Sequence, residues 1–257
     1  MDLDAQRTAI RPLLAPSAPE DALTAYYALY HDPRRVQLTL HHAPGGDTCP
    51  GPVLSGVEEQ NRRLDGFIAV CQTGQDLFRP LVVIRAADDA AVVDLLNRAL
   101  VPGRPYYMIA PIELARTLQR LLVMPEPAVH CIYRVDPARF QSTRTAEINV
   151  LLQERRDSDG LPRWEIHSRG RVAAAAGTNW RSPFCAEVYV YTEPEFRRRG
   201  WGRAVLQAAT AELLLEGLLP LYRARDDNLP SILLAKAAGY ADTGRREVAG
   251  EVYLRAP

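Results

Sequence analysis

The stretch "EVYVYTEPEFRRRGWGRAVLQAATAELLLEGLL", residues 187–219, joins an alternating segment to three arginines, a Gly-x-Gly turn and an apolar-striped segment. The alternation predicts a strand, and the apolar spacing after Gly202 predicts a helix. A helix start leaves about four backbone N–H groups without partners and carries about half a positive charge. Gly200 and Gly202 let an anion approach this backbone. Further charge comes from Arg197, Arg198, Arg199 and Arg203. The stretch therefore predicts a diphosphate site.

Two common phosphate-binding motifs are excluded by single residues. A P-loop needs a lysine directly after its last glycine, but Lys236 is the only lysine of the chain. A dinucleotide fingerprint needs a third glycine three residues beyond the second, where this chain has Val205.

The pattern R-x-x-G-x-G, residues 197–202, resembles the acyl-CoA-binding motif of the GCN5-related N-acetyltransferases, or GNAT family. In that family this turn and helix start hold the diphosphate of coenzyme A. The segment "RARDDNLPSILLAKAAGYADTG", residues 223–244, is similar to the second signature of the family, an asparagine followed by a helix that ends in Lys-x-x-Gly-Phe/Tyr. The matching positions are Asn228, Ser231, Lys236, Gly239 and Tyr240. The resemblance covers residues 145–257.

The first half of the chain carries no comparable motif. Its patterns nevertheless predict strands, helix, strand, helix and strand, the order expected in the second half as well. The resemblance therefore implies a mixed α/β (α+β) fold with a central sheet flanked by helices, in two tandem GNAT-like domains. We expect a degenerate domain over residues 1–140 and an acetyl-CoA-binding domain over residues 145–257. Two separate strands, around "GRREV" and "EVYLR", are expected to close the chain.

The resemblance also implies a set of cofactor-binding residues on the strand, the turn and the second helix. These are Tyr189, Val190, Tyr191, Arg197, Arg198, Arg199, Gly200, Trp201, Gly202, Arg203, Asn228 and Ser231. Trp201 is also expected to pack under the turn. For Tyr189 and Tyr191, packing in the core or at its rim is the alternative.

An alkylamine is neutral in only about one molecule in a few thousand at pH 7, so a proton acceptor assists its attack on a thioester. The family resemblance places such a carboxylate on the strand before the turn, at Glu187; a solvated surface carboxylate is the alternative. It also implies that a backbone N–H near Tyr189 to Tyr191 stabilises the oxyanion. Many members carry a tyrosine where this chain has Ala235. Ser231, Tyr222 or Tyr240 could replace it as the acid.

The expected function is N-acetyl transfer from acetyl-CoA to the primary amine of a small molecule or amino acid-like acceptor. The alternatives are a protein N-terminal or lysine acetyltransferase, and a non-catalytic CoA-binding sensor or interaction module. The four cysteines of this 257-residue chain are far apart, so no metal is expected, and a reducing cytoplasm fits. The net charge of zero and the absence of a long apolar run predict no nucleic-acid or membrane partner. A monomer or a homodimer is expected.

Overall fold

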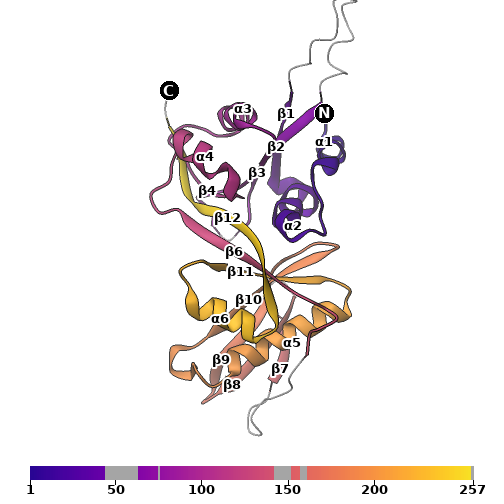
Figure 1. Ribbon diagram of the computed structural model, residues 1–257, viewed down its shortest axis with the longest axis vertical. Coiled ribbons are helices and arrows are strands. Elements are labelled where there is room, and N and C mark those ends of the chain that lie inside the picture. The colour runs from indigo at the N-terminus through magenta and orange to yellow at the C-terminus, as the bar shows by residue number, and fades with distance from the viewer. Residues whose placement is uncertain (44–62, 75, 142–151, 157–160, 256–257) are drawn as a thin grey trace, which may run out of the picture. The chain divides into compact units, whose positions relative to one another are not determined.

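The computed structural model describes residues 1–43, 63–74, 76–141, 152–156 and 161–255 (Figure 1). The chain packs as two compact units. Unit 1 comprises Met1–Ala15, Leu23–Ala128 and Glu247–Pro257, and unit 2 comprises Pro16–Ala22 and Val129–Arg246. The expected domain boundary near Thr145 lies outside the described residues and stays a prediction.

Unit 1 is a mixed sheet with helices. Its elements are α1 (Leu3–Ile10), the end of α2 (Pro19–Ala25), β1 (Val36–His42), β2 (Leu64–Cys71), β3 (Leu81–Ala86), α3 (Asp89–Ala99), β4 (Pro105–Pro111), α4 (Ala115–Leu121), β5 (Leu122–Val123) and the end of β12 (Tyr240–Leu254). Strands β1, β2 and β3 are antiparallel neighbours, and β3 runs parallel to β4. The last strand of the chain pairs antiparallel with β4 and completes this sheet.

The core of unit 1 forms where α3 covers the sheet. Asp88 caps α3 by accepting a hydrogen bond from the backbone N–H of Ala91 at 2.8 Å. The helix then buries Val92, Leu95 and Leu96 in one cluster with residues of β2, β3 and β4. Each fully buried side chain of this kind stabilises the fold by roughly 1.5–3 kcal/mol.

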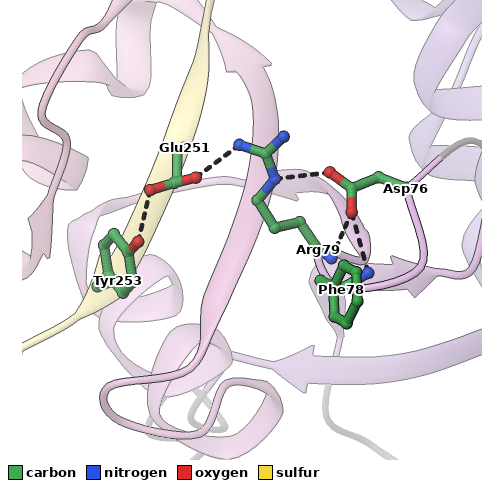
Figure 2. Close-up of polar contacts among 5 residues, drawn as sticks. All are labelled: Asp76, Phe78, Arg79, Glu251 and Tyr253. Carbon is green, nitrogen blue, oxygen red and sulfur yellow. Dashed lines mark hydrogen bonds and ion pairs between the residues drawn. The ribbon is translucent and has the colours of Figure 1, made fainter.

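An arginine ties the last strand to the segment before β3 (Figure 2). The Arg79 guanidinium donates to Asp76 and to Glu251, each at 2.6 Å, and Glu251 also accepts from the Tyr253 hydroxyl. Asp76 in turn accepts from the backbone N–H groups of Phe78 and Arg79. The hydrogen bond from Arg79 lowers the pKa of Asp76, and the bonds from Tyr253 and then Arg79 lower the pKa of Glu251. This ionic network joins the last strand to the segment before β3 within unit 1.

Unit 2 is built on a second mixed sheet. Its elements are β6 (Ala128–Val135), β7 (Leu152–Arg156), β8 (Pro162–Ser168), β9 (Arg171–Arg181), β10 (Cys185–Thr192), α5 (Trp201–Leu215), β11 (Leu219–Arg225), α6 (Leu229–Ala237) and the start of β12. Strands β7 to β10 form an antiparallel run, β10 is parallel to β11, and β11 pairs antiparallel with β6.

The core of unit 2 lies between α5 and one face of this sheet. Val205, Leu206, Ala209 and Leu213 of α5 are buried in one cluster with residues of β8, β9, β10 and β11. Val188 of β10 belongs to this cluster, so its neighbour Glu187 points to the opposite face of the sheet. The strand alternation read from the sequence is therefore present.

The two units repeat one order of elements. The series β3, α3, β4, α4 in unit 1 corresponds to β10, α5, β11, α6 in unit 2, and in both the two strands are parallel and follow antiparallel ones. The predicted mixed sheet flanked by helices and the predicted duplication are confirmed. The two expected closing strands are wrong, because β12 runs without a break from Tyr240 to Leu254. Helix α1 was not predicted.

Candidate functional site

The two parallel strands of unit 2 separate, and a cavity lies beside the separation. The parallel pairs run from Cys185–Leu219 to Glu187–Leu221, whereas β10 continues to Thr192 and β11 to Arg225. The cavity has a volume of about 740 Å³. Its lining comes from β10, the turn, α5, β11 and α6, namely Val190, Tyr191, Thr192, Phe196, Arg197, Arg198, Gly200, Trp201, Gly202, Arg203, Tyr222, Asn228, Pro230, Ser231 and Leu234. Its size suits a small-molecule ligand.

The turn that opens α5 leaves the helix start without a side-chain cap. Gly200 is the N-cap residue in the left-handed conformation, with φ of 76°, and no side chain caps the helix there. An added Cβ at Gly200 would meet nothing within 4 Å, so the backbone conformation, rather than crowding, requires this glycine. The first amide groups of α5 therefore remain suited to an anion.

Gly202 has a different role within the same turn. It is buried in the first turn of α5, and an added Cβ would lie 2.6 Å from the Thr192 Oγ atom. Absence of a side chain therefore lets the helix start approach the end of β10. This packing role stands beside the predicted one, close approach of a diphosphate, which stays a prediction.

Two arginines of the turn, Arg197 and Arg199, are held by the backbone and by aromatic rings, respectively. Trp201 stacks on Phe196 with ring centroids 5.5 Å apart, and both are buried, so Trp201 packs under the turn as expected. The Arg199 guanidinium lies over both rings, 5.5 and 5.3 Å from their centroids. Arg197 donates through Nε to the backbone oxygen of Thr192 at 3.3 Å. These contacts concentrate positive charge at the helix start.

Tyr222 of β11 and Ser231 of α6 both line the cavity. Asn228 caps α6, since its side chain accepts from the Ser231 backbone N–H at 3.2 Å. The Ser231 hydroxyl in turn lies 2.9 Å from the Tyr222 hydroxyl, and either group can donate. Burial raises the pKa of Tyr222 above its ordinary value of 10.0. A proton donor therefore faces the cavity from β11 although Ala235 lacks a hydroxyl.

Tyr240, the other tyrosine considered as an acid, lies in the core. It is 3% exposed, and its hydroxyl lies 2.7 Å from the Thr210 hydroxyl. It is not part of the cavity lining among the described residues. Its position fits the packing role that the family signature gives to this aromatic residue.

Glu187 is buried at the point where β10 and β11 separate. Its carboxylate accepts from the Asn179 side chain at 2.8 Å, from the Trp180 indole at 2.9 Å and from Arg223 at 3.4 Å. Glu187 does not line the cavity among the described residues. A solvated carboxylate was the alternative, and an exposed fraction of 6% excludes it. The close pairing with Trp180 and the register shift beside it were not readable from the sequence.

The three predicted residues of β10 divide between two places. Val190 and Tyr191 line the cavity. Tyr189 is absent from that lining among the described residues, and its ring lies against Gly177, where an added Cβ would come within 2.7 Å of the Tyr189 hydroxyl. Sequence reasoning missed Thr192, Phe196, Pro230 and Leu234 as lining residues, although each is adjacent or close in sequence to a predicted one.

The described residues hold no group of three or more His, Cys, Asp or Glu side chains suited to a metal ion. Within the same residues, no helix is long and apolar enough to span a membrane.

Residues 127–240 match the model of the Acetyltransferase (GNAT) family. No curated protein matches the chain. Among solved structures, a tandem GNAT protein from the clavulanic acid biosynthesis pathway is similar over 98% of this chain and 94% of its own, with 11% identity and a TM-score of 0.55. A GCN5-related N-acetyltransferase from Kribbella flavida covers 74% of this chain and 87% of its own, with 17% identity and a TM-score of 0.56. A GCN5-related N-acetyltransferase-like protein from Streptococcus suis covers 92% of this chain and 98% of its own, with 12% identity and a TM-score of 0.53.

These likenesses define the fold. Residues 127–240, which include the turn and the cavity lining, are similar to the acetyltransferase domain of the GNAT family. The chain as a whole has a fold similar to that of a tandem GNAT protein.

Proposed function

We propose that unit 2 transfers an acetyl group from acetyl-CoA to the primary amine of a small molecule or an amino acid-like acceptor. The observation that carries the proposal is the cavity, whose lining runs from the uncapped start of α5 to the point where β10 and β11 separate. A helix start of this kind suits a diphosphate, and the gap in strand pairing leaves room for an extended chain beside the strand.

We assign a part of the carrier to each element that lines the cavity. The backbone amides of residues 201–203 would hold the diphosphate, with Arg197, Arg198 and Arg203 as charged partners. Val190 and Tyr191 would lie along the pantetheine, whose amides need partners that unpaired strand backbone can supply. Asn228 and Ser231 would contact the carrier from α6.

The reaction joins the amine nitrogen to the thioester carbonyl carbon and breaks the carbon–sulfur bond. The nitrogen loses a proton, and the departing sulfur gains one. We assign the first proton to Glu187, directly or through water, because its buried carboxylate stands at the separation of β10 and β11. The second would come from Tyr222, which lines the cavity with Ser231. A backbone N–H of β10 near Tyr189 to Tyr191 would stabilise the oxyanion.

Release of the CoA thiol in the presence of an amine panel tests this reaction. The panel should contain small amines, amino acids, a lysine peptide and a peptide with a free N-terminus. We expect amine-dependent release with a small amine or amino acid. In the Glu187→Gln variant, turnover should fall about 100-fold while acetyl-CoA affinity stays within twofold. Glu154→Gln, at an exposed position on β7, is the matched control.

One observation favours a second function, a CoA-binding sensor without turnover. Ala235 is fully buried where many family members carry the acid, and the Glu187 carboxylate is already held by Asn179, Trp180 and Arg223. A sensor would bind acetyl-CoA and release no thiol above hydrolysis with any amine of the panel. Release with the peptides alone would instead assign a protein acceptor.

A further inference from the structure

An arginine occupies a hairpin position that normally takes glycine, asparagine or aspartate. The register of β8 and β9 pairs Ser168 with Arg171, so Arg169 and Gly170 form a two-residue loop. Their φ angles are 52° and 77°, both positive, as in a type I′ turn. A residue other than glycine is strained when its φ is positive, and such strain persists where the surroundings or a function require it.

The same backbone feature recurs in the neighbouring turn. Among the described residues, the non-glycine positions with positive φ are Arg169 and Arg198. Arg198 lies in the turn before α5 and lines the cavity. Two turns from different parts of unit 2 therefore each hold an arginine in a conformation that arginine disfavours.

The hairpin brings its arginines to the ring that underlies the α5 turn. The guanidinium carbons of Arg169, Arg171 and Arg199 lie 6.0, 5.4 and 5.5 Å from the centroid of the Phe196 ring. Phe196 is 1% exposed, whereas the three arginines are exposed. We call these three residues the arginine clamp.

The arginine clamp carries three positive charges, and Glu195, which pairs with Arg171, neutralises one of them. Arg171 forms an ion pair with Glu195, while three guanidinium groups gather over one ring. Like charges repel at such separations, so an arrangement of this kind is favoured by an added anion. Guanidinium forks match phosphate oxygens with two parallel hydrogen bonds.

The clamp is adjacent to the cavity without lining it. Phe196 and Trp201 line the cavity, whereas the three clamp arginines are not part of that lining among the described residues. The anion of the clamp is therefore a second one, beyond the diphosphate assigned to the start of α5.

We propose that the arginine clamp binds a phosphate monoester of the acyl carrier, the one on the ribose of coenzyme A. This inference rests on the proposed function, because the carrier must occupy the cavity for its ribose phosphate to reach the clamp. A phosphate monoester carries close to two negative charges at pH 7, which three guanidinium groups can balance.

Calorimetric titration with acetyl-CoA and with acetyl-3′-dephospho-CoA tests the proposal. The wild-type protein should bind acetyl-CoA roughly tenfold more tightly than the dephospho carrier, the ratio expected for one charge-assisted contact. In the variant Arg169→Gly, Arg171→Gln, which leaves Arg199 in place, the ratio should fall towards one, with affinity for the dephospho carrier within about twofold of wild type. Arg139→Gln, which removes another exposed arginine of unit 2, should keep the wild-type ratio.

The outcomes separate the clamp from the proposed function. Equal binding of both carriers by the wild-type protein overturns the clamp and leaves the proposed function standing. An equal loss for both carriers in the double variant also overturns it, because the arginines then act as general charge. Binding of neither carrier by the wild-type protein overturns the proposed function itself.

Thermal unfolding of the single variant Arg169→Gly provides a second readout. Glycine tolerates positive φ, so relief of strain should leave the melting temperature unchanged or raise it. A lower melting temperature would show that Arg169 is required by the fold, and it would overturn the assignment to a ligand.

Discussion

The hydroxyl groups of Tyr222 and Ser231 lie 2.9 Å apart and join strand β11 to helix α6 in the wall of one cavity. Tyr222 thereby faces the cavity from a strand position that neither family signature contains. Because Ala235 has no hydroxyl, we propose this pair as the proton donor for a departing thiolate.

Replacing Tyr222 by phenylalanine should lower kcat by about 100-fold and leave acetyl-CoA affinity almost unchanged. Burial raises the pKa of Tyr222 above 10.0, so the hydroxyl stays protonated throughout the neutral and mildly alkaline range. The kcat of the wild-type protein should therefore show no decline from this group below about pH 10. Steady-state kinetics between pH 6 and about 10 measure both effects.

The control for Tyr222→Phe is Tyr240→Phe, which removes a buried hydroxyl outside the cavity lining. It should lower stability through the lost contact with Thr210 while preserving kcat in the folded fraction. Equal kcat for Tyr222→Phe and wild type would reject the assignment of Tyr222 as the acid.

A double substitution separates the two roles of Gly202. Gly202→Ala places a carbon against the Thr192 hydroxyl and should lower stability by about 1–3 kcal/mol. Adding Thr192→Ala removes the opposing atom and should restore most of that loss. We expect acetyl-CoA binding to stay weakened in the restored protein, because the new methyl group remains at the helix start. Denaturation and calorimetry check the two effects, and full recovery of binding would leave Gly202 a packing role alone.

His130 makes unit 2 sensitive to acid. Burial, then the nearby charge of Arg223, lowers the pKa of His130 from 6.5 to about 4, and its Nδ1 atom is buried without a hydrogen-bond partner in the described structure. The unfolded chain therefore binds this proton at higher pH than the folded chain does. Stability should fall as the pH drops from about 6.5 to 4.

Thermal unfolding of wild type and His130→Gln across this range measures the contribution of His130. The charges that act on it are those of Arg223, Glu187, Arg225 and Asp226. The variant should lose less stability than wild type between pH 6.5 and 4. Parallel curves for the two proteins would show that another group is responsible.

The ionic network around Arg79 should make the stability of unit 1 depend on pH (Figure 2). Its hydrogen bonds lower the pKa values of Asp76 and Glu251, so their stabilising contribution is present above the ordinary values of 3.8 and 4.5 and is lost as the pH falls. Arg79→Gln should lower the melting temperature at pH 7 and have little effect at about pH 3. Arg35→Gln, which breaks an exposed ion pair with Asp32, should have little effect at either pH.

The sequence predicted the order of elements and the position of the anion-binding turn because both depend on local patterns. Alternation defines β10, and glycines mark the start of α5. The single long β12 was not predictable, since the glycines at 244 and 250 interrupt its apolar pattern and the pairing partners that keep it extended are distant in sequence.

The residues of the candidate site also divide into those that local patterns predict and those that depend on distant parts of the chain. Gly200 and Asn228 are the N-cap residues of α5 and α6, so a local motif predicts their positions. The contacts of Glu187 with Trp180 and Arg223, and of Tyr222 with Ser231, depend on the register of strands and on where α6 packs. Such contacts between elements have no signal in a single sequence.

The crystal structure of the protein with acetyl-CoA tests the central claim most directly. We predict phosphate oxygens of the diphosphate within about 3 Å of backbone nitrogens in the first turn of α5, with the thioester next to Tyr222. A carrier bound elsewhere on the chain, with the α5 start free of phosphate, would contradict the account.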